Sequence, residues 1–289
     1  MIRSMLFVPG NREDMLSVID NYAADSVNID MEDTVPPDQK EKARLLVRTI
    51  LQNKKEKKRK IIVRINSLDT AYWQRDLQEI MPIKPDIIML AKSDSATGME
   101  ELSVKIAEEE GNNDIKVGST KILPLLESAL GIENAFLIAT ADSRIMGLFL
   151  GAEDFTRDLH AQRTKESKEI FYARTRLVCA ARAAGIEAYD TPFTDIDDIG
   201  GLKADALFAK QLGFTGKATF SPQHAQHINE VFTPTAEQIQ YAQEVIKAVE
   251  EGKRQGKGTV ALKGKLLDKP MVERAKQVIA NARELGVIV

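Results

Sequence analysis

Eight short apolar runs, each separated from the next by a longer stretch of helical character, constrain the fold of this chain more than any other feature of its sequence. Each run is continuously apolar or β-branched rather than alternating, as expected for parallel strands that are buried on both faces. The runs cover residues 4–10, 26–32, 60–66, 86–92, 120–127, 144–151, 186–192 and 216–222. Amphipathic segments such as MEELSVKIAEEEG lie between them. Repeated strand–helix units of this kind predict a parallel sheet covered by helices.

Eight such units within about 220 residues predict an α/β fold, a (β/α)8 TIM barrel. A doubly wound open sheet is the alternative, but it normally carries a G-x-G-x-x-G phosphate turn, and the sequence contains none. We expect a catalytic barrel domain over residues 1–222. Residues 223–289 are expected to form a C-terminal helical extension or lid, which would pack on a neighbouring subunit.

Charge and cysteine content exclude several classes of protein. The chain has 40 Lys and Arg against 43 Asp and Glu, which is not the basic balance of a nucleic-acid-binding protein. The basic run KKEKKRK (54–60) is expected to be the solvated end of a helix, with a ligand phosphate as the alternative partner. One cysteine, Cys179, cannot form an internal disulfide, which favours the reducing cytoplasm. No run approaches the roughly 18 apolar residues of a membrane span, so no membrane partner is expected.

Acidic side chains follow several of the predicted strands, at the end where (β/α)8 enzymes place their active sites. Glu32 and Asp33 follow the second run, Glu127 ends the fifth, and Glu153 and Asp154 follow the sixth. Carboxylates gathered in one place are costly unless a cation neutralises them, and oxygen ligands select Mg²⁺ rather than zinc. We expect Glu127 and Asp154, at the ends of adjacent strands, to share one Mg²⁺.

Some of these residues also have a purely structural interpretation. Asp33 would cap the helix that follows Pro36, and Glu153 would pair with a basic residue. Arg64 lies in the third strand, where it either binds a substrate carboxylate or enolate oxygen or pairs with one of the acids. Lys217, near the eighth strand, is either a phosphate ligand or a solvated lysine. The residues alone leave these alternatives open.

Six segments carry a family resemblance that runs nearly from end to end. They are RSMLFVPGNREDML, ADSVNIDMEDTVPPDQKEKAR, IIVRINSLDT, LPLLESALGIENA, GLFLGAEDFTRDL and FTGKATFSPQH. In this order they resemble the citrate lyase β subunit and the wider HpcH/HpaI aldolase family, which includes malyl-CoA and citramalyl-CoA lyases and thioesterases. The resemblance implies a (β/α)8 barrel with a C-terminal extension and dependence on Mg²⁺.

The resemblance also implies roles for particular residues around the metal. It assigns metal binding to Glu127 and Asp154 and substrate or enolate binding to Arg64. It assigns the organisation of water and metal, and catalysis through them, to Glu32 and Asp33.

Further residues would contact the substrate. Main-chain N–H groups of Gly151, Ala152 and Glu153 would hold the keto-acid carboxylate, and Arg12 would contact the phosphates of CoA or phosphopantetheine. Asp268, in KGKLLDKPMVERA, matches a catalytic acid/base that acts on a neighbouring subunit in oligomeric relatives. By itself, LLDKP predicts only a helix N-cap.

The reaction that the resemblance implies is cleavage of a 3-hydroxy-acyl thioester, with a citryl thioester giving oxaloacetate and an acetyl thioester. A free-standing malyl-CoA or citramalyl-CoA lyase or thioesterase is one alternative, and a non-catalytic acyl-CoA-binding barrel is another. If an acyl-carrier protein holds the thioester, the citrate lyase α and γ subunits are expected partners. If CoA holds it, the chain is expected to act alone as a homo-oligomer of the trimer type.

Overall fold

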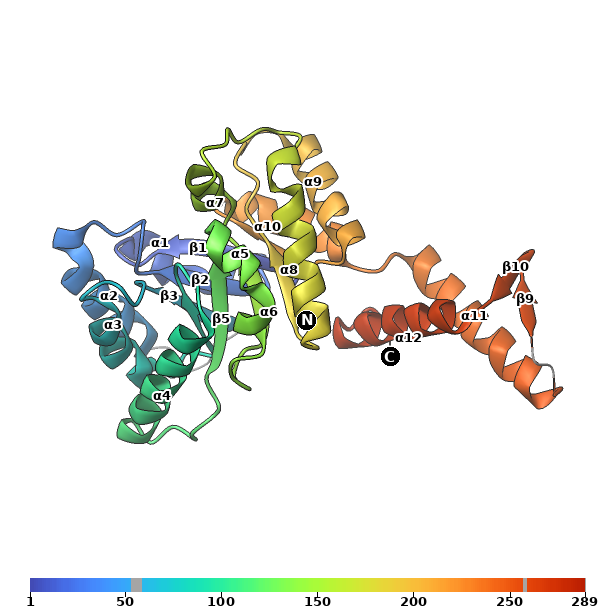
Figure 1. The fold of residues 1–289 in the computed structure, drawn as a ribbon, viewed down its shortest axis with the longest axis horizontal. Helices are drawn as coiled ribbons and strands as arrows, with labels where there is room; N and C mark the ends of the chain where they lie inside the picture. The colour runs from blue at the N-terminus through green and yellow to red at the C-terminus, as the bar shows by residue number, and fades with distance from the viewer. Residues whose placement is uncertain (53–58, 257–258, 289) are drawn as a thin grey trace. The chain divides into compact units, whose positions relative to one another are not determined.

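The computed structural model describes residues 1–52, 59–256 and 259–288, so most of the basic run 54–60 lies outside the described residues. The chain forms two compact units, one of Ile2–Asn229 and one of Met1 with Glu230–Val289. The larger unit is a closed barrel of parallel strands in the order β1 to β8. Figure 1 shows strands of this unit with helices around them. The predicted (β/α)8 barrel is therefore confirmed, and the open doubly wound sheet is wrong.

Every predicted apolar run contains one barrel strand. The strands are β1 (Ser4–Pro9), β2 (Ser26–Asp30), β3 (Lys60–Ile65), β4 (Ile87–Leu90), β5 (Lys121–Leu126), β6 (Gly147–Leu150), β7 (Glu187–Asp190) and β8 (Gly216–Thr219). The barrel closes because β1 pairs in parallel with both β2 and β8. The strands are shorter than the runs, which continue into the loops that carry the polar side chains of the mouth.

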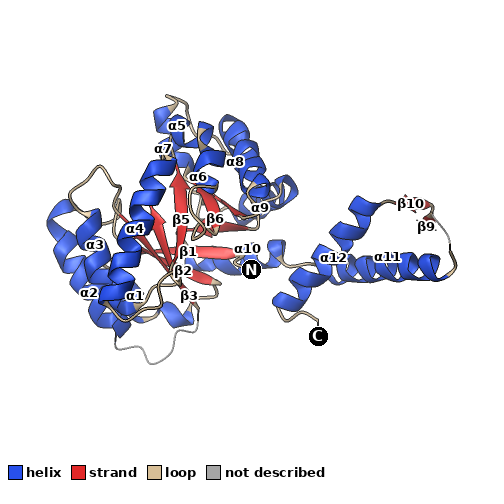
Figure 2. Ribbon diagram, turned by 60° about the horizontal axis from the view of Figure 1, so that its bottom comes forward, coloured by secondary structure: helices blue, strands red, loops and turns tan. Residues whose placement is uncertain are grey.

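Helices follow the strands and lie outside the barrel (Figure 2). They are α1 (Glu13–Ser17), α2 (Lys40–Gln52), α3 (Trp73–Ile80), α4 (Ala96–Asn112), α5 (Ala129–Glu133), α6 (Ala135–Ala139), α7 (Ala152–Asp158), α8 (Phe171–Ala183), α9 (Ile199–Leu212) and α10 (Pro222–Phe232), with 3-10 turns η1 (Ile19–Asn21), η2 (Pro37–Gln39), η3 (Met81–Ile83) and η4 (Lys168–Ile170). In α2, for example, Ala43, Val47 and Leu51 are buried at four-residue spacing, the spacing of one helix face.

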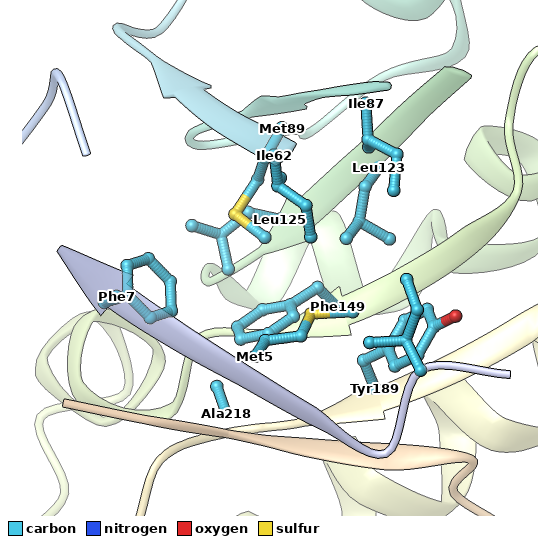
Figure 3. Packing of buried hydrophobic residues seen from close by; sticks show 11 residues of the cluster. Met5, Phe7, Ile62, Ile87, Met89, Leu123, Leu125, Phe149, Tyr189 and Ala218 are labelled. Atoms are coloured by element: carbon cyan, nitrogen blue, oxygen red, sulfur yellow. The ribbon is translucent and has the colours of Figure 1, made fainter. Parts of the chain in front are cut away.

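Side chains at alternate strand positions fill the barrel interior (Figure 3). The rings of Phe7 and Phe149 meet edge to face, with centroids 6.0 Å apart and planes at 73°. Successive strand side chains point to opposite faces, so the residue two places after an inward side chain also points inward. Because Ile62 and Leu125 point into the barrel, Arg64 and Glu127, each two residues further along the chain, also point inward. The strands themselves thus carry polar groups into the mouth of the barrel.

The smaller unit contains α11 (Ala236–Arg254), β9 (Val260–Leu262), β10 (Lys265–Leu267) and α12 (Lys269–Glu284). The two helices share a small core of Ile239, Ala242, Val245, Ala275, Ile279 and Ala282. Between them β9 and β10 pair as an antiparallel hairpin, which the expected helical extension did not include. Lys263 and Gly264 turn the hairpin with positive φ angles of 48° and 77°, as a tight two-residue hairpin turn requires.

Candidate functional site

Two cavities open at the carboxyl ends of the strands, and Glu127 and Asp154 line both of them. The smaller, about 160 Å³, has mainly apolar walls and is called here the apolar cavity. Its walls include Phe7, Leu125, Phe149, Ala152, Pro192 and Phe220. The larger, about 350 Å³, is called the polar cavity. Its lining includes Ser67, Ser93, Ser95, Ser128, Lys92 and Arg157.

Arg64 is held in the mouth by a buried ion pair. The strand register sets Asp30 of β2 opposite Arg64 of β3, and Nε and Nη2 each donate to a different Asp30 oxygen at 2.7 Å. Burial lowers the pKa of Arg64, but the charges of Asp30, Glu32 and Glu127 outweigh it and raise the pKa above its usual value. Arg64 therefore stays charged. The pairing interpretation is confirmed, and the same side chain also lines the apolar cavity.

Glu127 is a buried carboxylate at the mouth of the barrel. The residue is only 5% exposed. Oε1 accepts the Lys92 main-chain N–H at 2.8 Å. Burial raises the pKa of Glu127 to about 8; Arg64 opposes this, while the charges of Asp154 and Glu32 add to it. A cation beside this group would favour its ionised form.

Gly151, two residues beyond Phe149, leaves the room that Glu127 occupies. A Cβ at Gly151 would lie 2.8 Å from Glu127 Oε2 and 2.7 Å from its Cβ, so a larger residue there would displace the carboxylate. The Gly151 N–H donates to Leu126 O at 2.9 Å, and the Ala152 N–H donates to Thr191 Oγ1 at 3.2 Å. Both amides thus have partners within the chain, and their expected contact with a keto-acid carboxylate stays a prediction.

Asp154 lies in the first turn of α7 and completes the acidic pair. Its side chain is 16% exposed, and Arg157 Nη1 lies 3.0 Å from Oδ1. Within residues 1–52, 59–256 and 259–288, no group of three or more His, Cys, Asp or Glu side chains is placed to hold a metal. Two carboxylates beside an open cavity fit Mg²⁺, which usually keeps several waters, better than zinc, which usually takes three or four protein ligands.

Glu32 and Lys92 form an ion pair beside Glu127 and Asp154. Lys92 Nζ lies 3.0 Å from Glu32 Oε1, and Arg64 Nη1 lies 3.3 Å from Oε2. Burial raises the pKa of Glu32, and Arg64 and Lys92 only partly offset that rise. Lys92 has a φ of 51°, a left-handed value that non-glycine residues rarely adopt. This turn directs its N–H to Glu127 and its ammonium to Glu32. The sequence analysis did not predict a role for Lys92. Its position at the end of a predicted strand could have indicated one.

Asp33 and Glu153 are both exposed at the edge of the apolar cavity. The 3-10 turn η2 begins after Pro36 without a side-chain cap, so the interpretation of Asp33 as a helix cap is wrong. Glu153 Oε1 accepts from Arg163 Nε at 3.0 Å, which confirms the expected pairing with a basic residue.

Two other expected site residues lie outside these cavities. Arg12 is exposed and pairs with Asp14 at 2.6 Å, and it lines neither cavity. Asp268 belongs to the smaller unit, where Oδ1 accepts the Met271 N–H at 2.8 Å and caps α12. The N-cap interpretation is therefore confirmed, while the catalytic role of Asp268 stays a prediction.

Lys217 is fully buried, so both interpretations made from the sequence are wrong. Its Nζ contacts Asp190 Oδ2 at 2.7 Å, Thr191 O at 2.6 Å and Asp205 Oδ2 at 2.6 Å, which uses all three ammonium hydrogens. Arg174 Nη2 lies 2.8 Å from both Asp190 and Asp205. This cluster joins β7, β8, α8 and α9 below the mouth. It leaves no N–H of Lys217 for a phosphate.

None of the helices in the described part of the chain combines the length and apolar character that a membrane crossing needs.

Comparison with known proteins agrees with this geometry. A family model described as HpcH/HpaI aldolase/citrate lyase matches residues 3–222. The chain is 40% identical over 285 residues to the citrate lyase subunit beta of Leuconostoc mesenteroides subsp. cremoris, covering 98% of this chain and 94% of that protein. It is 30% identical to the mitochondrial citramalyl-CoA lyase of Rattus norvegicus, covering 98% of this chain and 86% of that protein.

Among solved structures, the chain is similar to protein CitE from Mycobacterium tuberculosis in complex with magnesium, acetoacetate and coenzyme A. The TM-score is 0.80 at 28% identity, covering 97% of this chain and 98% of that one. The resemblance read from the sequence motifs is therefore confirmed. The chain belongs to the HpcH/HpaI aldolase/citrate lyase family.

Proposed function

We propose that this chain is a Mg²⁺-dependent lyase of the citrate lyase β type, which cleaves a citryl thioester to oxaloacetate and an acetyl thioester. One observation carries the proposal: Glu127, a buried carboxylate with a pKa raised to about 8, shares a cavity with Asp154 and Arg64. Similarity to the Leuconostoc citrate lyase subunit over nearly the whole chain supports the choice of reaction. The magnesium and coenzyme A in the Mycobacterium structure support the choice of cofactor and thioester.

Glu127 and Asp154 are the residues that would hold the metal. When bound, Mg²⁺ supplies Lewis-acid chemistry that acidifies the substrate hydroxyl and stabilises the leaving keto acid. The two cavities that both acids line offer room for an ion with water and substrate ligands.

The chain's own residues account for the proton and charge movements. Glu32, with Asp33 beside it, accepts the hydroxyl proton as the carbinol becomes a ketone. The electron pair of the broken carbon–carbon bond passes to the thioester, whose enolate oxygen Arg64 stabilises. Asp30 already fixes the Arg64 guanidinium, so little reorganisation is needed as charge develops. Asp268 of a neighbouring subunit then protonates the enolate carbon.

We propose an assembly to go with this reaction. Residues 1–222 form the catalytic domain, and residues 223–289 cover the barrel of a neighbouring copy in a homo-oligomer of the trimer type. Arg12 contacts the phosphates of the thioester carrier. If the carrier is an acyl-carrier protein, citrate lyase α and γ subunits complete the enzyme; with CoA the chain acts without them.

The test is release of keto acid from citryl-CoA, malyl-CoA and citramalyl-CoA by purified protein with Mg²⁺. We expect oxaloacetate from citryl-CoA, no turnover by Asp154→Ala, and full turnover by Asp38→Ala, an exposed acid that lines neither cavity. Turnover of malyl-CoA or citramalyl-CoA alone would favour the second candidate, a free-standing lyase, which the similarity to the rat enzyme supports. Thioester binding without any turnover would instead favour a non-catalytic barrel.

A further inference from the structure

The polar cavity contains two cations that differ in how firmly the fold holds them. Lys92 is held in place by two acids of the site, since its N–H donates to Glu127 at 2.8 Å and its Nζ lies 3.0 Å from Glu32. Arg157, in the last turn of α7, has a side chain that is 74% exposed. Its Nη1 lies 3.0 Å from one oxygen of Asp154, a contact made within the same helix. Arg157 is therefore the cation of this cavity that can turn toward a ligand.

Apart from Glu127 and Asp154, the acids that line the polar cavity each accept a hydrogen bond from a neighbouring serine or main-chain N–H. Asp69 accepts from Ser67 and Asp94 accepts from Ser128, while Asp158 accepts the Ala129 N–H at 2.8 Å. None of these contacts uses the Arg157 guanidinium. A guanidinium can bind a carboxylate through two parallel N–H groups, which makes such a contact strong and directional.

The apolar cavity offers no equivalent cation. Arg64 already donates two N–H groups to Asp30 at 2.7 Å, and its third nitrogen lies 3.3 Å from Glu32. The remaining walls include Phe7, Phe149 and Phe220. A second carboxylate on a substrate would lose its hydration there and would compete with the enolate oxygen for Arg64. The polar cavity is thus the side of the acidic pair that suits a charged substituent.

Three related thioesters differ in one substituent on the carbinol carbon. It is hydrogen in the malyl, methyl in the citramalyl and carboxymethyl in the citryl compound. The bond that breaks is the same in all three. A residue that contacts this substituent therefore changes the choice of substrate without taking part in bond cleavage.

We propose that Arg157 is a specificity-determining residue, which binds the carboxymethyl carboxylate of the substrate in the polar cavity. The inference rests on the proposed lyase function and names the group that selects a citryl over a citramalyl thioester. Arg157 leaves Asp154 and donates to the substrate carboxylate when the substituent enters the cavity.

The experiment compares kcat/KM for citryl-CoA with kcat/KM for citramalyl-CoA in wild type, Arg157→Gln and Arg157→Lys. Loss of a hydrogen-bonded charge pair should lower the citryl-to-citramalyl preference by about 10- to 100-fold in Arg157→Gln. Arg157→Lys should recover part of it, because charge remains and the two-pronged geometry is lost. The matched control is Arg75→Gln on α3, whose side chain is 51% exposed, pairs with Glu79 at 2.8 Å and lines neither cavity. It should keep the wild-type preference.

A binding measurement separates this inference from the lyase function. With Mg²⁺ present, calorimetry of oxaloacetate and pyruvate compares the same two substituents without turnover. We expect wild type to prefer oxaloacetate and Arg157→Gln to lose that preference, even if no thioester is cleaved. Cleavage with an equal fall for both thioesters in Arg157→Gln would overturn the inference and leave the lyase function standing. Unchanged oxaloacetate affinity in Arg157→Gln would overturn it as well.

Discussion

Replacing Glu127 with Gln should stabilise the metal-free protein at neutral pH while removing its response to Mg²⁺. Gln keeps the shape of the side chain and an oxygen that can accept the Lys92 N–H, but it cannot ionise. The carboxyl pKa is raised from 4.5 to about 8 by burial, so between these values the folded protein binds more protons than the unfolded chain. Stability due to this group therefore falls as pH rises from about 4.5 to 8.

The size of the effect follows from the same shift. At pH 7 this carboxyl is ionised in the unfolded chain but mostly protonated in the folded protein, which lowers the free energy of unfolding by roughly 3 kcal/mol. That loss corresponds to roughly 5–10 °C in Tm for a chain of this size. Below pH 5 the wild-type and Glu127→Gln proteins should differ little. Mg²⁺ binds the ionised carboxylate, so it should raise the Tm of wild type and release protons on binding.

The assay is calorimetric unfolding of wild type and Glu127→Gln from pH 5 to 8, with EDTA or with Mg²⁺. Glu108→Gln, an exposed glutamate whose side chain is 54% accessible, is the control and should follow wild type throughout. A Tm difference between wild type and Glu127→Gln that stays constant with pH would refute the reasoning. So would an equal Mg²⁺ response in the two proteins.

Three further substitutions test separate parts of the site. Arg64→Lys breaks the two-pronged contact with Asp30 and should lower kcat about 100-fold or more, with oxaloacetate release as the measurement and unchanged kcat as the contradicting result. Asp268→Asn keeps the α12 cap and should leave the free energy of unfolding within about 0.5 kcal/mol of wild type while turnover falls; normal turnover would exclude an acid/base role. Lys217→Met leaves Asp190 and Asp205 with one cation fewer. It should lower the free energy of unfolding, measured by denaturant titration, by about 3–5 kcal/mol, and a loss below about 1 kcal/mol would show that the cluster contributes little.

The barrel could be predicted because its information is local and repeated. Eight continuous apolar runs can be buried on both faces only in a parallel sheet covered by helices, and each run contains one strand of the structure. The acids at the strand ends could be found for the same reason, since Glu127 follows the inward Leu125 by two residues. The hairpin of β9 and β10 was missed because its strands have three residues each and little apolar periodicity.

The fate of single charged residues could not be predicted from local sequence. Lys217 follows a glycine at the start of β8 and has no acidic neighbour in the sequence, yet the closed barrel sets it against Asp190 and Asp205. Cys179 looks like a packed helix residue in its apolar segment, but it is exposed. The partners of Lys217 come from β7 and α9, which barrel closure brings to it.

The sequence by itself determined the strand count, the family and the acids that end the strands, because these depend on patterns within short segments. The tertiary structure decided which charges meet. The register of β2 against β3 pairs Asp30 with Arg64, and the left-handed turn at Lys92 directs its N–H to Glu127. Such contacts depend on barrel closure, and the electrostatic energy of a charge is set by neighbours that closure brings together.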